Sequence, residues 1–96
     1  MNLQQITDIL KANKSFIHSQ YKAEVKGVFG SYSRGEQKPD SDLDILVAFE
    51  KGATLFTQAG LINYLQEKIG IKVDVVSERA VKNKLRPYIE SDLIKI

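Results

Sequence analysis

One apolar run constrains the fold of this chain more than any other feature of its sequence. Residues Leu43–Phe49 read LDILVAF, which is almost continuously apolar and rich in β-forming residues. Such a run is typical of a strand that other elements cover on both faces. The chain has 96 residues, enough for one hydrophobic core and too few for two. We therefore expect a single domain, residues 1–96, built around this central strand.

Stretches with helical spacing precede and follow this strand in the sequence. The first covers residues 3–17, and Asn2 can cap its start. The second covers residues 55–69, where Thr54 can cap the start and Gly70 can end the helix in the left-handed conformation. Both patterns predict amphipathic helices with one face against the sheet.

The rest of the chain adds two strands and a last helix. Short β-forming segments occupy residues 25–29 and 71–77, and the polar stretch 31–41 is predicted to be a loop. Helical patterning resumes over residues 80–96 with an interruption at Pro87. The expected order is α-β-β-α-β-α, and the fold class is α+β with a short mixed sheet packed against helices.

Composition excludes several classes of chemistry and partner. The chain has no cysteine and a single histidine, His18, so carboxylates must carry any metal chemistry. A net charge of +2 is too mild to indicate a nucleic-acid binder, and nucleic acid is not expected as a direct ligand. No apolar run approaches the ~20 residues that span a bilayer, and no export signal is visible. We expect a cytoplasmic protein without a membrane partner.

A pair of carboxylates begins the apolar strand. Asp42 and Asp44 are two residues apart, so on a strand they project from the same face. Like charges in this position repel one another, and a divalent cation resolves the repulsion. Oxygen ligands suit Mg²⁺ or Mn²⁺, and Mg²⁺ characteristically combines one or two carboxylates with waters and substrate phosphates. The pair therefore predicts a metal-dependent site for a nucleoside triphosphate.

Other residues complete this candidate site. Asp74 lies in the middle of a β-forming segment, and three carboxylates converge if that strand lies beside the one that carries Asp44. Such a group can hold two metal ions, one for the attacking hydroxyl and one for the leaving pyrophosphate. Gly30 and Ser31 end the preceding strand, where exposed amides and a hydroxyl can bind phosphate oxygens. Arg34 can add a bidentate phosphate contact.

These residues together carry a family resemblance. Gly30 and Ser31, then ten intervening residues, then Asp42 and Asp44, with Asp74 on a later strand, resemble the DNA polymerase β-like nucleotidyltransferase superfamily. Within it, the short chain looks like the minimal nucleotidyltransferases, the antitoxins of the MntA–HepT type. The resemblance implies the polymerase β-like fold, metal binding by Asp42 and Asp44, a third catalytic carboxylate at Asp74, and triphosphate contacts from Gly30 and Ser31.

The resemblance also implies an activity and a partner. Enzymes of this superfamily transfer a nucleoside monophosphate to an acceptor hydroxyl, and in the MntA-like branch AMP moves from ATP to a tyrosine of a HEPN-domain toxin. The chain is too short for a substantial acceptor-binding domain, so a second polypeptide should hold or provide the acceptor. Two alternatives stay open: a non-catalytic antitoxin that neutralises its toxin by binding, and a transferase that acts on a small molecule or an RNA end.

Overall fold

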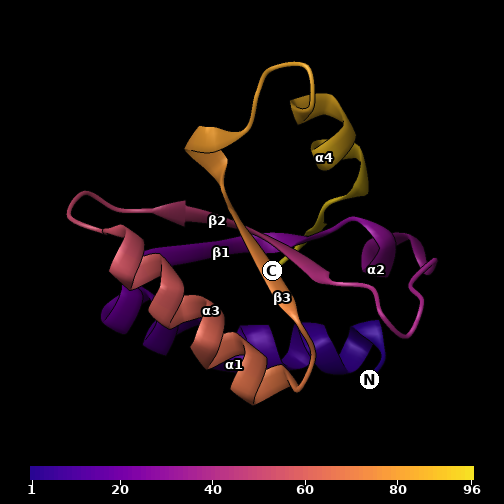
Figure 1. The fold of residues 1–96 in the computed structure, drawn as a ribbon, viewed down its shortest axis with the longest axis horizontal. Helices are drawn as coiled ribbons and strands as arrows, with labels where there is room; N and C mark the ends of the chain where they lie inside the picture. The colour runs from indigo at the N-terminus through magenta and orange to yellow at the C-terminus, as the bar shows by residue number, and fades with distance from the viewer.

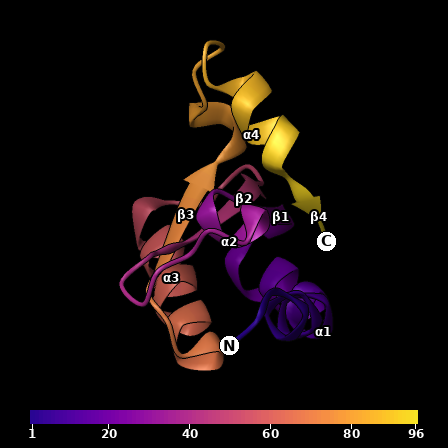
Figure 2. The same cartoon turned by 90° about the vertical axis from the view of Figure 1, so that its right-hand side faces the viewer.

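The computed structural model describes residues 1–96 and contains one four-stranded mixed sheet in the order β3-β2-β1-β4 (Figure 1; β4 is seen in Figure 2). The two central strands, β1 (Ala23–Phe29) and β2 (Leu43–Phe49), are antiparallel. The edge strand β3 (Val73–Ser77) runs parallel to β2, and the short β4 (Ile94–Lys95) pairs antiparallel with β1. The mixed sheet and its helices confirm the predicted α+β class.

Two long helices, α1 (Leu3–Tyr21) and α3 (Leu55–Ile69), cover one face of this sheet (Figure 2). Asn2 and Thr54 cap their starts as predicted, because each side chain accepts a hydrogen bond from a backbone amide of the first turn. Gly70 follows α3 in the left-handed conformation (φ 81°). None of the helices combines the length and apolar character needed to cross a membrane.

The hydrophobic core lies between these helices and the sheet. Every second residue of β2, from Leu43 through Ile45 to Val47, points into the core. All three side chains are fully buried. Leu46 points to the opposite face and is only 6% exposed, because the C-terminal part of the chain lies against it. The strand is therefore central in the sheet, as the apolar run predicts. Other fully buried core residues are Ile6, Leu10, Ile17, Ala23, Val25, Val28, Leu61 and Leu65.

The predicted loop over residues 31–41 is wrong at its start. The single helical turn α2 (Ser31–Arg34) follows β1 directly. The carbonyl of Gly30 accepts hydrogen bonds from the amides of Ser33 and Arg34 and from Ser33 Oγ, the last at 2.7 Å. Side chains of one turn cannot show helical periodicity, which is why the sequence pattern did not reveal it.

The predicted helix over residues 80–96 is also wrong in extent. The chain there forms a short 3₁₀ turn, Glu78–Ala80, then α4 (Arg86–Asp92) and finally β4. Pro87 does not interrupt a helix but lies in the first turn of α4, where the missing amide hydrogen is not needed. The last residues leave the helix because they pair with β1. The observed order therefore adds α2 and β4 to the predicted one.

Candidate active site

The carboxylates predicted from the sequence lie on the sheet face opposite α1 and α3. In the parallel register of β2 and β3, Asp44 is the direct partner of Asp74. Residues paired in this way project from the same face, and neighbouring strands are about 4.8 Å apart. Asp42 immediately precedes β2, two residues before Asp44. The structure therefore brings the strand of Asp74 beside the strand of Asp44, which is the condition that the sequence left open.

The electrostatics of Asp44 reflect this crowding. Partial burial raises the pKa of the Asp44 carboxyl to about 6, and the negative charges of Asp74 and Asp42 contribute in the same direction. The positive charge of Arg34 acts against the rise. The negative charges of Asp42 and Asp74 beside the half-buried Asp44 create a place where a cation is stabilised.

The donor set fits a hard divalent cation. No three histidine or carboxylate side chains are grouped closely enough to form a ready-made metal site. Asp42 and Asp44 nevertheless supply the one or two carboxylates that Mg²⁺ commonly takes from a protein, with water and phosphate oxygens as its other ligands. The local repulsion at Asp44 is what such an ion would relieve.

Gly30 is required where β1 ends beside this carboxylate. Its backbone has φ 78° and ψ −154°, a conformation that is essentially restricted to glycine. A Cβ atom built on Gly30 would overlap Asp44 Oδ2 and lie 3.2 Å from Asp44 Cγ. Ser31 is half-buried and begins α2. Of the predicted phosphate-binding pair, Gly30 thus lies directly against the predicted metal-binding carboxylate of Asp44, and Ser31 follows it at the start of α2.

Arg34 lies at the end of α2, and its guanidinium contacts two carboxylates. Nε donates to Glu36 Oε1 at 2.5 Å, and Nη1 donates to Asp92 Oδ2 at the end of α4. These two hydrogen bonds raise the pKa of Arg34 above its usual range, so the group stays cationic. Sequence reasoning missed Asp92, because nothing in its local pattern indicates a contact with a residue 58 positions earlier.

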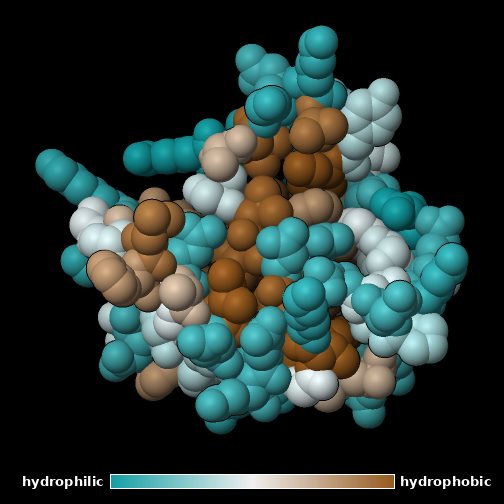
Figure 3. Space-filling model, in the orientation of Figure 1, coloured by the Kyte–Doolittle hydropathy of each residue, from teal (hydrophilic) through white to brown (hydrophobic).

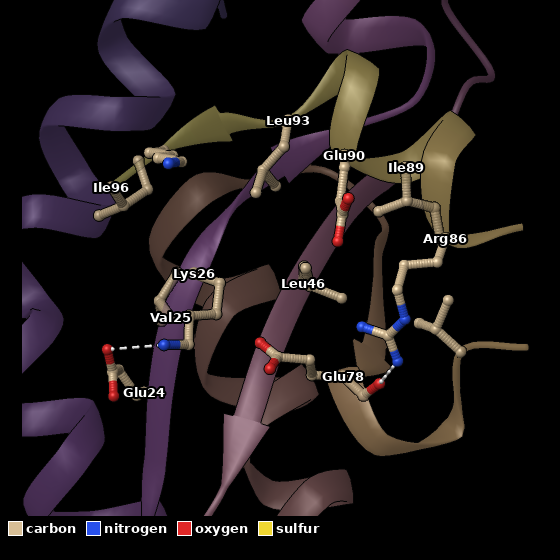
Figure 4. A pocket seen from close by; sticks show the side chains of 12 residues that line it. Glu24, Val25, Lys26, Leu46, Glu78, Arg86, Ile89, Glu90, Leu93 and Ile96 are labelled. Carbon is tan, nitrogen blue, oxygen red and sulfur yellow. Dashed lines mark hydrogen bonds and ion pairs between the residues drawn. The ribbon is translucent and has the colours of Figure 1, made fainter. Parts of the chain in front are cut away.

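A pocket of about 540 Å³ opens on the same face of the sheet, between β2 and α4 (Figure 4). Leu46 forms part of its floor, and Ile89 and Leu93 of the C-terminal segment line the opposite side. The charged groups around it include Glu78 and Arg86, whose Nη2 donates to the Glu78 carbonyl at 3.4 Å. Leu46 follows Asp44 by two residues, so the pocket opens on the same face of β2 as Asp44, although Asp42, Asp44 and Asp74 do not line it.

The surface around the pocket is partly apolar. Figure 3 shows apolar side chains along β3 that continue towards α4, with hydrophilic groups on both sides. Sequence reasoning did not identify this pocket, because its walls come from segments far apart in the chain. The face opposite the core therefore combines clustered carboxylates, a turn that requires glycine, an arginine bound by two carboxylates, and an accessible cavity.

The mixed sheet, with carboxylates beside the Gly30 turn, is what the resemblance to nucleotidyltransferases implies, and comparison with known proteins shows the family. The nucleotidyltransferase domain family matches residues 5–96, and the chain belongs to this family. Its enzyme class is therefore nucleotidyltransferase. The resemblance to the minimal nucleotidyltransferases, inferred from the motif, is confirmed by the relatives below.

Two of the relatives are matched over almost their whole length, and a third over about three quarters. The protein adenylyltransferase MntA of Thermococcus cleftensis is 35% identical over 96 residues, which cover 100% of this chain and 97% of the relative. A solved structure described as a candidate minimal nucleotidyltransferase is 40% identical, covers 100% of this chain and 97% of its own, and superimposes with a TM-score of 0.85. A chain in a toxin–antitoxin structure with AMP-PNP is 25% identical and superimposes with a TM-score of 0.70. The match covers 99% of this chain and 72% of that one.

Proposed function

We propose that this chain is an antitoxin that transfers AMP from ATP to a tyrosine hydroxyl of a partner HEPN-domain toxin. The observation that carries the proposal is the pairing of Asp44 with Asp74 across β2 and β3, directly beside the Gly30 turn. This arrangement supports a metal-dependent triphosphate site, with Asp74 as a further carboxylate for the acceptor.

The relatives support the choice of AMP and of a protein acceptor. One is named a protein adenylyltransferase, and another belongs to a toxin–antitoxin pair determined with an ATP analogue. The fold is also shared, at 22% identity, with a structure described as a tri-AMPylated Shewanella oneidensis HEPN toxin in complex with its MNT antitoxin. An acceptor on a second polypeptide also agrees with our expectation that residues 1–96 form a single domain.

In the proposed reaction Asp42 and Asp44 would hold Mg²⁺, with Mn²⁺ as a possible substitute and Asp74 as a ligand to a second ion. Such ions, when bound, neutralise the triphosphate and lower the pKa of an attacking hydroxyl. Gly30 and Ser31 contact the phosphate oxygens through backbone amides and the hydroxyl, and Arg34 adds its guanidinium.

The chemical step is an in-line displacement at the α-phosphorus. The acceptor oxygen forms the new bond to phosphorus, and the bond from phosphorus to the bridging oxygen breaks as pyrophosphate leaves. Asp74 is exposed beside Asp44, where it can orient the acceptor hydroxyl and accept its proton. The open face beside the carboxylates leaves room for the acceptor to approach as part of another protein.

The first test is transfer of label from α-phosphate-labelled ATP in the presence of Mg²⁺ and lysate of the source cells. We expect the wild type and a matched Asp40→Asn control, changed on an exposed turn, to label one small protein. The Asp42→Asn/Asp44→Asn variant should lose at least about 100-fold of this activity while keeping its fold, because it loses the metal-binding charge. Equal labelling by this variant would contradict the proposal.

Other outcomes would point to the alternatives. Label in RNA or in small molecules would favour a transferase with a different acceptor. If the double variant still neutralises the toxin in cells, neutralisation depends on binding rather than catalysis. A toxin that carries AMP on tyrosine only when the wild type is present is the result that the proposal requires.

A further inference from the structure

The side chain of Arg34 is restrained before any nucleotide binds. An arginine guanidinium has five N–H groups. Nε–H is used by Glu36 and one Nη1–H by Asp92, so five minus two leaves three N–H groups for another anion. The side chain of Arg34 is 46% exposed, so these donors are accessible. Glu36 lies in the same loop, whereas Asp92 reaches Arg34 from α4.

The segment that carries Asp92 is anchored on both sides of it. On its C-terminal side, Ile94 and Lys95 pair with Val28 and Gly27 of β1. The last amide, of Ile96, donates to the carbonyl of Lys26 at 3.1 Å. On its N-terminal side, Asp92 completes α4. The Asp92 side chain is 24% exposed and is carried by a segment anchored on both sides, so it is a fixed point for Arg34.

Arg34 is close enough to the carboxylates to act on them. It ends the turn that begins after Gly30, and its amide donates to the Gly30 carbonyl at 3.3 Å. Its charge also influences the ionisation of Asp44. The restrained guanidinium is thus part of the face where the triphosphate would bind.

We propose that Asp92 is a positioning residue for nucleotide binding, which holds Arg34 so that its three free N–H groups meet the triphosphate. The inference rests on the proposed function and adds a residue to it. An ion pair whose arginine is 46% exposed contributes little to stability. Its value lies in pre-organisation, because a long side chain that is already ordered loses less entropy when the ligand arrives.

The test is a double-mutant cycle in which calorimetry measures the affinity for AMP-PNP with Mg²⁺. We expect Asp92→Asn to weaken binding about three- to tenfold, the cost of ordering one long side chain. Arg34→Gln should weaken it about tenfold or more, because it removes the cationic donor itself. Adding Asp92→Asn to Arg34→Gln should cost nothing further. Asp92→Glu should restore affinity to near the wild-type value, and Asp8→Asn on α1 is the matched control.

Each contrary outcome has a definite meaning. Unchanged affinity in a folded Asp92→Asn protein would overturn the inference and leave the proposed function standing. Equal losses with and without Arg34 would overturn it too, because Asp92 would then act by another route. If the wild type did not bind AMP-PNP with Mg²⁺ at all, the proposed function would fail, and this inference with it.

A second measurement tests the contact between Arg34 and Asp92 if the Asp92→Asn variant does not fold. The Nη1–H resonances of Arg34 in the wild-type protein report directly on its contact with Asp92. A resolved, slowly exchanging signal is expected. A signal averaged to the position of a free arginine would overturn the inference.

Discussion

The two faces of the sheet differ in the packing and charge of their side chains. On the face under α1 and α3, the side chains of Leu43, Ile45 and Val47 of β2 are apolar and fully buried. On the opposite face the same strand carries Asp44. Burial and neighbouring negative charges raise the pKa of its carboxyl to about 6. The difference teaches that one well-packed face supplies the stability with which a small chain can tolerate repelling carboxylates on the other.

The largest expected effect comes from breaking the packed face. Ile45 and Leu46 are consecutive but point to opposite faces, and their exposed fractions are 0% and 6%. Ile45→Ala should lower the free energy of unfolding by about 3 to 4 kcal/mol, because it leaves a cavity in a closed core. Leu46→Ala should cost about 1 to 2 kcal/mol, because its side chain already borders an open pocket. Urea unfolding of both variants measures the contrast, and equal losses would show that the two faces are packed alike.

A smaller effect would sharpen the comparison at the glycine turn. Gly30 and Gly35 both have positive φ, of 78° and 71°, but only Gly30 lies against a side chain, that of Asp44. Gly30→Ala should cost about 2 to 3 kcal/mol of stability and also displace Asp44, which weakens nucleotide binding. Gly35→Ala should cost about 1 kcal/mol, because nothing lies within 4 Å of its added Cβ.

Thermal unfolding together with AMP-PNP titration separates these two consequences. Backbone strain alone would lower the melting temperature of both variants. Loss of nucleotide affinity is expected only for Gly30→Ala. If Gly35→Ala lost as much affinity, the contact with Asp44 would not be the reason that glycine is needed at position 30.

The smallest effect is the contribution of Asp44 to the pH dependence of stability. Its folded pKa of about 6 lies above the ordinary value of 3.8, so folding favours the protonated form. The stability it contributes is fully present below about pH 4 and is lost as the pH rises through about 6. Such a shift corresponds at full strength to about 3 kcal/mol. Because the side chain is only half-buried and water screens it, we expect about 1 kcal/mol.

Asp44→Asn should therefore stabilise the protein by about 1 kcal/mol at pH 8 and have no such effect at pH 3.5. Unfolding by urea at both pH values, with Asp40→Asn as the control, measures the difference. Destabilisation at pH 8 would mean that the carboxylate makes favourable contacts that outweigh its burial and repulsion.

Much of the architecture was predictable because it depends on local patterns. The apolar run Leu43–Phe49 matches β2 over its whole length, and the capped helical segments match α1 and α3. The end of β1 at Gly30 was predictable for a similar reason, because glycine permits a backbone conformation that other residues avoid. The same patterns failed over residues 80–96, where the helical spacing concealed a short helix and a strand.

The sequence by itself determined the covered face of the sheet, its capped helices and the spacing of the carboxylates along β2. These follow from residue periodicity and from the conformations that single residues allow. Only the tertiary structure decided that Asp74 pairs with Asp44, that Asp92 reaches Arg34, and that α4 and β2 enclose a pocket. Each of these depends on how strands and helices far apart in the chain meet, and no local pattern encodes that meeting.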